Sequence, residues 1–428
     1  MRGKDRTICW LVLDGVADRP APTLDGQTPL EAAATPNLDR LASAGINGTM
    51  DVARPGTPLS SDRAHTLLFG YDHAEVPGRG VLEATGLDVP VPDDGVACSA
   101  SFARAEATAD GWTVTDRHLD ADAADYERAS ERVAAFETDA ATVSFTYTWK
   151  NRGIVSLDPD DPADRPLSPA VTDVDPFETP APVLDPRPLD DAPDHTAAAR
   201  TADALATYTR WSADHLADEP VDLVLSKWAG APGRPESFAD RHGLQACSLT
   251  PKPVLAGLAE TLGMAVRDPP EDYAARPDAI GAALDEFDFV HVHYPEPDEV
   301  SHAAGPAEKR DEVEAIDATL EPVVDRALAD DELVTVVTAD HTTPSTEDVV
   351  HSGEPVPVTT VTEGVRTDAV STVGERPAAT GGLGRIRGRD LLRLSRAAAD
   401  RVLLDGLRRT PQNRDYPNQH FQPLSRDP

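Results

Sequence analysis

The fold is decided by one stretch near the N-terminus, Ile8-Cys9-Trp10-Leu11-Val12-Leu13-Asp14-Gly15. Its six apolar residues follow one another without a polar break, as expected of a strand buried on both faces of a parallel sheet. The strand ends at Asp14, and open α/β sheets place their sites at the carboxyl ends of such strands. For Asp14 taken alone, a helix-capping or turn role is the alternative.

Further apolar runs at 221–225, 287–294 and 333–338 also indicate core strands, and helical patterns separate them. Strands that alternate with helices predict a mainly parallel sheet, and hence an α/β fold. We expect helices at 36–44, 196–217, 255–262, 277–287 and 308–328, the last of them interrupted at Pro322.

The character of the chain changes near residue 93, where short alternating runs and turns rich in Asp and Pro begin. This pattern predicts a smaller inserted α+β domain at 93–190. The core domain would then comprise 1–92 and 191–410. The segment 411–428 is polar and contains proline, which favours a loosely ordered tail.

The chain is strongly acidic, with 75 Asp and Glu residues against 39 Lys and Arg, a net charge of −36. Only five of the basic residues are lysines, and the acidic residues are spread along the whole sequence. Such a surface suits solubility in concentrated salt, where screening weakens self-repulsion. It argues against a nucleic-acid partner, because no basic patch is available to neutralise phosphates.

No uninterrupted run of about 18 apolar residues is present, so we expect no membrane span. The apolar run at 8–13 is too short for the core of a signal peptide, which favours a cytoplasmic protein. The three cysteines, Cys9, Cys98 and Cys247, are scattered and odd in number, and we expect them to be buried small hydrophobes.

A second informative stretch is Arg54-Pro55-Gly56-Thr57-Pro58-Leu59-Ser60-Ser61-Asp62-Arg63-Ala64-His65. The Pro and Gly residues predict a turn, and the residues after it predict a helix with Ser61 or Asp62 as its N-cap. A hydroxyl group at a helix N-terminus is well placed to hold a phosphoryl group. A plain capping role for Ser61 is the alternative unless other residues can activate it.

Residues that could activate Ser61 follow the expected core strands. The set gathered at one sheet edge is Asp14, Ser61, Asp298, His302, Asp340, His341 and His351. Three carboxylates in one cleft would repel one another, and divalent cations would relieve that repulsion. Mixed Asp and His ligation suits Zn²⁺ or Mn²⁺, with Mg²⁺ also possible. Two metals about 4 Å apart could hold a phosphoryl group and ionise Ser61 as an in-line nucleophile.

With these residues identified, the chain resembles the archaeal-type cofactor-independent phosphoglycerate mutases of the alkaline phosphatase superfamily, over roughly residues 7–395. The shared motifs include Leu13-Asp14-Gly15, Thr35-Pro36-Asn37-Leu38-Asp39, Pro55-Gly56-Thr57-Pro58, Ser61-Asp62, Gly78-Arg79-Gly80, Asp173-Val174-Asp175-Pro176, Asp298-Glu299 with His302, Ala339-Asp340-His341, His351-Ser352-Gly353 and Gly381-Gly382-Leu383-Gly384-Arg385-Ile386-Arg387-Gly388.

The resemblance implies a three-layer, alkaline-phosphatase-like sandwich whose inserted domain covers the substrate. It implies Ser61 as the nucleophile that forms a phosphoserine. One metal would be bound by Asp14, Ser61, Asp340 and His341, and a second by Asp298, His302 and His351. Interconversion of 3-phosphoglycerate and 2-phosphoglycerate would then require cations that hold the substrate, for which the candidates are Arg79, Arg117, Arg152 and Lys227.

The substrate-facing half departs from the family pattern. A family Lys falls at Pro295, and a family Arg falls at Lys227. These departures leave open a phosphohydrolase, or a mutase, that acts on another small phosphorylated metabolite. A non-catalytic member with a binding role is the third alternative. The sequence gives no signal for the oligomeric state.

Overall fold

The computed structural model describes residues 6–117, 119, 121–346, 349–402 and 425–426. The chain divides into two compact units. The first comprises 1–73, 236–252 and 262–428, and the second comprises 74–235 and 253–261. The tail expected at 411–428 lies outside the described residues, except for 425–426.

The first unit is built on an eight-stranded sheet that contains β1 (Thr7–Leu13) at its centre. The strand order is β11 (Ala265–Arg267), β10 (Ala246–Leu249), β12 (Phe289–Tyr294), β1, β13 (Leu333–Thr338), β14 (Val356–Val361), β2 (Ile46–Asp51) and β15 (Gly384–Arg387). The five strands from β11 to β13 run parallel, and only β14 runs against its neighbours. The mainly parallel sheet expected from the sequence is confirmed.

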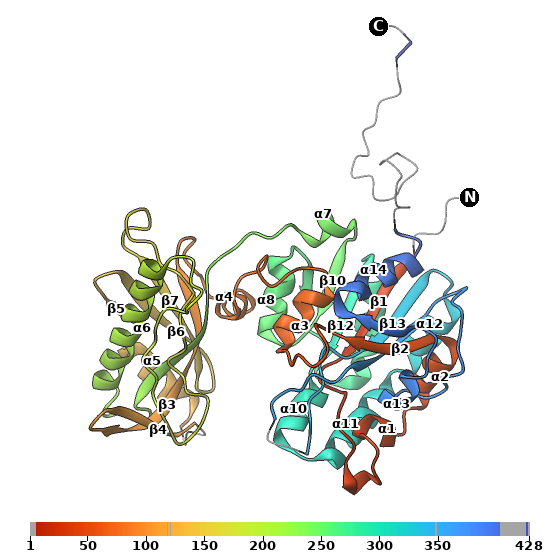
Figure 1. Ribbon diagram of the computed structural model, residues 1–428, viewed down its shortest axis with the longest axis horizontal. Coiled ribbons are helices and arrows are strands. Elements are labelled where there is room, and N and C mark those ends of the chain that lie inside the picture. The colour runs from red at the N-terminus through yellow and green to blue at the C-terminus, as the bar shows by residue number, and fades with distance from the viewer. Residues whose placement is uncertain (1–5, 118, 120, 347–348, 403–424, 427–428) are drawn as a thin grey trace. The chain divides into compact units, whose positions relative to one another are not determined.

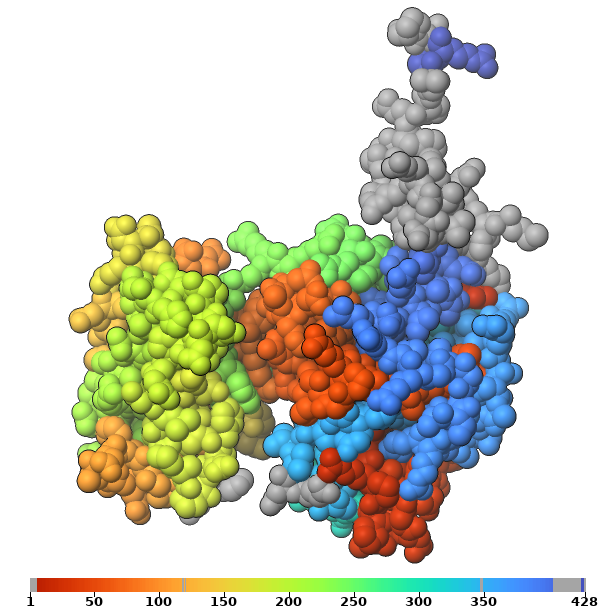
Figure 2. All heavy atoms as spheres, in the orientation of Figure 1, coloured from red at the N-terminus to blue at the C-terminus, as the bar shows by residue number. Residues whose placement is uncertain are grey.

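Helices cover both faces of this sheet (Figure 1). On one face lie α2 (Pro36–Ala44), α9 (Arg276–Leu284), α11 (Pro306–Thr319) and α12 (Glu321–Ala329), which pack against one another. On the other face lie α3 (Ser61–Leu68) and α14 (Gly388–Ala398), far apart in sequence but adjacent on the surface in Figure 2. Trp10 joins β1 to this second layer, since its indole N–H donates to Ser395 of α14 and its ring stacks on Phe69.

Local sequence signals set the ends of several helices in this unit. Pro36 is the first residue of α2 and Gly45 follows its last, as expected. The helix expected at 308–328 is divided at Leu320, so that Pro322 lies in the first turn of α12, where a missing N–H costs little. The shorter helices are α1 (Pro29–Ala32), α7 (Phe238–His242), α10 (Glu296–Ala303) and α13 (Glu375–Ala378).

The second unit contains a seven-stranded sheet in which every pairing is antiparallel. Its strands are β3 (Val96–Thr108), β4 (Gly111–Asp116), β5 (Ala135–Glu137), β6 (Ala141–Trp149), β7 (Arg152–Pro159), β8 (Ala181–Pro182) and β9 (Leu223–Gly230). Alternate residues of β3 face opposite sides: Cys98 joins the core beneath α5 (Ala123–Arg132) and α6 (His195–His215), whereas Ala97 packs under α4 (Arg79–Gly86). Helix α8 (Pro253–Thr261) packs closely on α4.

The second unit is larger than the segment 93–190 expected from the sequence. The run at 221–225, expected in the core sheet, instead begins β9, which pairs with β3. The expected helices at 196–217 and 255–262 also belong to this unit, as α6 and α8. A buried apolar run looks the same in either sheet, so its pattern alone does not assign it to a unit. Among the described residues, no helix is long and apolar enough to cross a membrane.

One buried lysine joins two loops at the carboxyl edge of the first sheet. The Lys309 ammonium, on α11, is fully buried and donates to the carbonyl groups of Gly15, Ala17 and Thr343. Its fourth oxygen neighbour is the Asp18 carboxylate, at 3.0 Å. The loop after β1 and the loop after β13 are therefore held around one cation.

Replacing Lys309 with Met should lower the free energy of unfolding of the first unit by about 3–5 kcal/mol, because Asp18 would be left as an unpaired buried charge. Denaturant unfolding measures the change. The matched control is Arg310→Met, on the same helix, because Arg310 forms an ion pair with its exposed neighbour Asp311 at the surface. Equal stability of the two variants would contradict this role for Lys309.

Candidate metal centre

The predicted site residues meet at the carboxyl edge of the first unit's sheet. Asp14 follows β1, and Asp340 and His341 follow β13. Asp298 and His302 were expected in a loop, but both lie in helix α10. Their spacing of four residues places both on one face of this helix, so that the imidazole Nε2 of His302 lies 3.3 Å from Asp298. His351 lies between β13 and β14.

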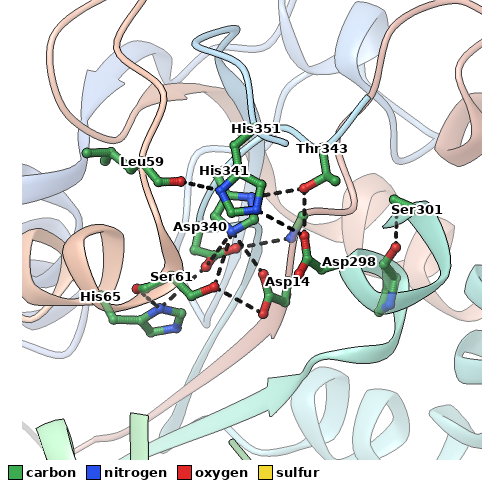
Figure 3. A network of polar contacts seen from close by, with 12 residues as sticks. Asp14, Leu59, Ser61, His65, Asp298, Ser301, Asp340, His341, Thr343 and His351 are labelled. Atoms are coloured by element: carbon green, nitrogen blue, oxygen red, sulfur yellow. Dashed lines mark hydrogen bonds and ion pairs between the residues drawn. The ribbon is translucent and has the colours of Figure 1, made fainter. Parts of the chain in front are cut away.

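Ser61 is the first residue of helix α3, whereas Ser61 or Asp62 had been expected as its N-cap. The cap is Ser60, whose extended backbone (φ −80°, ψ 158°) precedes the first helical turn. The shift of one residue puts the Ser61 side chain inside the positive end of the helix dipole rather than before it. Its hydroxyl oxygen lies 3.4 Å from Asp14 Oδ2 and 3.3 Å from His341 Nε2 (Figure 3).

Two overlapping groups of side chains have the spacing of metal ligands. The first is Asp14, Asp340 and His341, all fully or almost fully buried. Its His341 Nε2 lies 3.1 Å from Asp14 Oδ1 and 3.4 Å from Asp340 Oδ2. The second group is Asp298, His341 and His351, with His351 Nε2 at 3.4 Å from Asp298 Oδ1. His302 touches Asp298 but is outside this tighter group.

The hydrogen bonds of two imidazoles fix where their protons lie. His351 Nδ1 is 2.6 Å from the Leu59 carbonyl, which can only accept, so Nδ1 carries the proton. The Thr343 hydroxyl donates to Asp298 and therefore accepts from His341 Nδ1. When such a ring is neutral, its Nε2 bears the lone pair and is directed at carboxylate oxygens (Figure 3). A lone pair and a carboxylate oxygen repel each other, so a proton or a metal cation is needed between them.

The carboxylates give the same indication. Asp14 Oδ1 and Asp340 Oδ2 are buried, and neither has a hydrogen-bond partner within the described residues. Asp14, Asp298 and Asp340 bring three negative charges to the site. Buried anions without full compensation are costly, so the donor set fits divalent cations held by carboxylate oxygens and imidazole nitrogens.

The pKa values show that a proton competes with a metal cation for Nε2 of His341. Burial disfavours the imidazolium form of His341, but Asp340 and Asp14 outweigh it and raise the pKa of His341 to about 9. Burial and the charge of Asp14 raise the pKa of Asp340 to about 6. Without a metal, His341 Nε2 therefore holds a proton at neutral pH, and a bound cation must displace it.

Sequence reasoning missed the cation of this site, Lys252. Its ammonium lies 2.5 Å from Asp14 Oδ2 and 3.4 Å from Asp298 Oδ2. Burial opposes its charge, but these two carboxylates raise the pKa of Lys252 above its usual value. Lys252 follows β10, a four-residue strand that sequence reasoning had not identified, so nothing in the sequence connected it with Asp14. Thr343 was missed as well, although it lies two residues after His341.

The four predicted substrate cations all lie in the second unit, where three have carboxylate partners. Arg117 and Lys227 both pair with the buried carboxylate of Asp175. Arg79 pairs with Glu83 at 2.8 Å. The fourth cation, Arg152, is exposed and lies over the ring of Trp149.

One aromatic ring of the second unit connects two of these cations. Trp228 lies under the guanidinium of Arg79, 4.0 Å from the ring centroid, and under the Lys227 ammonium at 4.5 Å. Its backbone φ of 56° is unusual for a bulky residue, and its N–H is held by Asp173. Such a strained position next to clustered cations is typical of a binding site.

Comparisons with known proteins match nearly the whole chain. The model of the metalloenzyme superfamily matches residues 6–397. The 2,3-bisphosphoglycerate-independent phosphoglycerate mutase of Methanopyrus kandleri is 35% identical, covering 94% of this chain and 98% of that relative. The second enzyme of this name from Methanocaldococcus jannaschii is 32% identical, covering 95% and 96%.

Solved structures are also similar to this chain over most of its length. The PH0037 protein from Pyrococcus horikoshii has a TM-score of 0.76 at 27% identity, covering 94% of this chain and all of that one. The cofactor-independent phosphoglycerate mutase from Thermoplasma acidophilum has a TM-score of 0.62 at 27% identity, covering 92% and 100%. The similarity therefore spans both units of the chain.

Metal affinity should rise as the pH increases from neutral toward about 9, because the cation that binds His341 must displace the proton from its Nε2. Titration calorimetry with Mn²⁺ in buffers of different ionisation enthalpy should detect proton release on binding. His341→Gln should weaken binding and reduce that release by the proton of His341. Affinity that stays constant over this pH range would contradict the proton positions inferred for the site.

Proposed function

Because the chain belongs to the metalloenzyme superfamily and, within it, to the 2,3-bisphosphoglycerate-independent phosphoglycerate mutases, we propose that it interconverts 3-phosphoglycerate and 2-phosphoglycerate through a phosphoserine at Ser61. The observation that carries the proposal is the position of the Ser61 hydroxyl. It lies at the N-terminus of α3 and within 3.4 Å of both Asp14 and His341.

We assign two divalent cations to the site, Mn²⁺ or Zn²⁺ in preference to Mg²⁺, because imidazole nitrogen is a better ligand for the first two. Asp14, Asp340, His341 and Ser61 would hold one, and Asp298, His302 and His351 the other. When bound, such ions ionise a serine hydroxyl and neutralise the phosphoryl oxygens. The protein we expect is cytoplasmic and adapted to high salt, as its dispersed acidic charge suggests.

The phosphoryl group is then transferred in two steps, first to Ser61 and then back to glycerate. Ser61 Oγ loses its proton and forms a bond to phosphorus as the bond between phosphorus and the 3-oxygen of the substrate breaks, and the 3-oxygen takes up a proton to give glycerate. The 2-hydroxyl oxygen of glycerate next bonds to the same phosphorus, and the Ser61 Oγ–P bond breaks. The amide end of α3 faces the anionic group, and the Lys252 ammonium adds a permanent positive charge beside Asp14.

Purified protein with Mn²⁺ in concentrated salt should convert 3-phosphoglycerate into 2-phosphoglycerate, with no release of inorganic phosphate. Phosphorus-31 NMR resolves all three species in one experiment. Ser61→Ala should lower the rate on the order of a thousandfold or more while still binding metal, since Asp14, Asp340 and His341 remain. A fully active Ser61→Ala variant would exclude Ser61 as the nucleophile.

A phosphohydrolase, or a mutase for another small phosphorylated metabolite, is the second candidate. It is favoured by the pairing of Arg79, Arg117 and Lys227 with carboxylates, which reduces the positive charge available for a substrate with two anionic groups. In the same NMR experiment, accumulation of inorganic phosphate would support the hydrolase and contradict the mutase.

We assign substrate binding to Arg79, Arg117, Arg152 and Lys227. Lys227 is the most informative of them to replace, because Asp175 keeps a partner in Arg117 when Lys227 is lost. Burial lowers the pKa of Lys227, and the negative charge of Asp175 opposes this shift. The ammonium is therefore held in a partly desolvated position, where a hydrogen bond to an anion is strong.

Lys227→Met should raise the KM for 3-phosphoglycerate roughly 10–100-fold, which corresponds to loss of a charged hydrogen bond of about 1.5–3 kcal/mol. Steady-state kinetics measure the change, and kcat should fall less than kcat/KM. The matched control is Lys150→Met, an exposed lysine of the same unit, which should leave both constants unchanged. An unchanged KM in Lys227→Met would remove Lys227 from the substrate site.

A further inference from the structure

Three histidines behind the metal centre take no part in the function proposed above. They are His65 on α3 and His291 and His293 on β12, and all are at most 1% exposed. Each has hydrogen-bond partners at both ring nitrogens. Because a neutral imidazole has one donor and one acceptor, those partners determine which nitrogen holds each proton.

The parallel register of β10 and β12 builds two rows of side chains. Ser248 lies beside His291, and its hydroxyl is 2.9 Å from His291 Nδ1. Two residues further along, the Thr250 hydroxyl is 3.1 Å from His293 Nδ1. Residues two apart on a strand share a face, so both rows point the same way, toward the first turn of α3 and Asp14.

The first row ends at the backbone of the nucleophile. His65 Nδ1 is 2.8 Å from the Ser61 carbonyl, which only accepts, so this nitrogen holds the proton. His65 Nε2 must then accept from His291 Nε2, at 3.2 Å. His291 Nδ1 in turn accepts from the Ser248 hydroxyl. All three hydrogen bonds therefore run in one direction, from β10 to α3.

The second row ends at the Asp14 carboxylate. His293 Nε2 is 3.0 Å from Asp14 Oδ2, and an ionised oxygen requires a donor there. His293 Nδ1 is then an acceptor for the Thr250 hydroxyl. The Thr250 oxygen itself accepts from the backbone N–H of Lys252, which leaves its proton available for His293.

The geometry itself requires acceptor nitrogens, since the contact between His65 Nε2 and His291 Nε2 at 3.2 Å needs one nitrogen without a proton, and burial of the rings agrees with this. Burial is the largest cause in each case, and it lowers the pKa of His65 to about 4. It also lowers the pKa of His291 and of His293, although Asp14 opposes the shift at His293. Other charged groups face the rings from the ends of β1, β13 and β10; they are Asp14, Asp340, His341 and Lys252.

We propose that the two rows are positioning devices: Ser248, His291 and His65 fix the backbone of Ser61, and Thr250 and His293 orient Asp14 as a metal ligand. The proposal rests on Ser61 and Asp14 having the roles proposed above. It assigns opposite tautomers to neighbouring rings, with the proton on Nδ1 in His65 and on Nε2 in His291 and His293. A purely space-filling role requires no such assignment.

Crossed amide substitutions test these proton positions, because the Asn amide nitrogen replaces Nδ1 and the Gln amide nitrogen replaces Nε2. His293→Gln should keep Mn²⁺ affinity within about threefold of the wild type, whereas His293→Asn should lose about 10–100-fold, the usual effect of removing a partner of a metal ligand. For His65 the order reverses. His65→Asn should keep kcat, and His65→Gln should lower it about 10–100-fold with little change in KM.

A measurement on the intact enzyme covers the case in which a variant fails to fold. Nitrogen-15 NMR of protein labelled at histidine should show the Nδ1-protonated form for His65 and the Nε2-protonated form for His291 and His293. Equal losses in the Asn and Gln variants, or the opposite tautomers, would overturn the proposal. If the wild type fails to convert 3-phosphoglycerate, the proposed reaction fails, but metal affinity and tautomers still decide the role of the two rows.

Discussion

The architecture of the first unit depends on one electrostatic constraint. Asp14, Asp298 and Asp340 lie together at the carboxyl edge of a parallel sheet, largely out of water. Lys252 touches two of them, and without a metal His341 holds a proton beside Asp14 and Asp340, so the three carboxylates still exceed the cations by one charge. Divalent cations satisfy that excess, and their binding explains why two buried carboxylate oxygens have no hydrogen-bond donor among the described residues.

The fold supports this charge through hydrogen bonds whose directions are fixed. Lys309 holds the loops after β1 and β13 around one ammonium, so Asp14 and the Asp340–His341 pair keep their separation without a metal. The histidines divide into two kinds by the position of their protons. His341 and His351 donate a hydrogen bond from Nδ1, so that Nε2 is available to bind a metal. His293 instead donates from Nε2 to the candidate metal ligand Asp14. Chemically identical side chains thus act as ligands or as supports, according to their second partner.

Much of the site could be predicted because its residues directly follow strong strand signals. The uninterrupted runs before Asp14 and before Asp340 place both carboxylates at one sheet edge. Lys252 could not be predicted in this way, because the strand before it has four residues and a weak pattern. The sequence also could not show which sheet contains β9, because an apolar run gives no information about the strand with which it pairs. The observed start of α3 differs by one residue from the predicted one, because Ser60 and Ser61 are equally good N-cap residues.

In the proposed function, the first unit supplies the residues for phosphoryl transfer and the second supplies those that recognise the substrate. Every candidate metal ligand and the candidate nucleophile belong to the first unit, and all four candidate substrate cations belong to the second. The first set is constrained by mutual charge, so that replacing one member leaves others unpaired. The second set is held differently: Arg79 pairs with Glu83, and Arg117 and Lys227 share Asp175, which keeps a partner when one of them is replaced. Replacement of one candidate substrate cation therefore disturbs fewer partners than replacement of one candidate metal ligand.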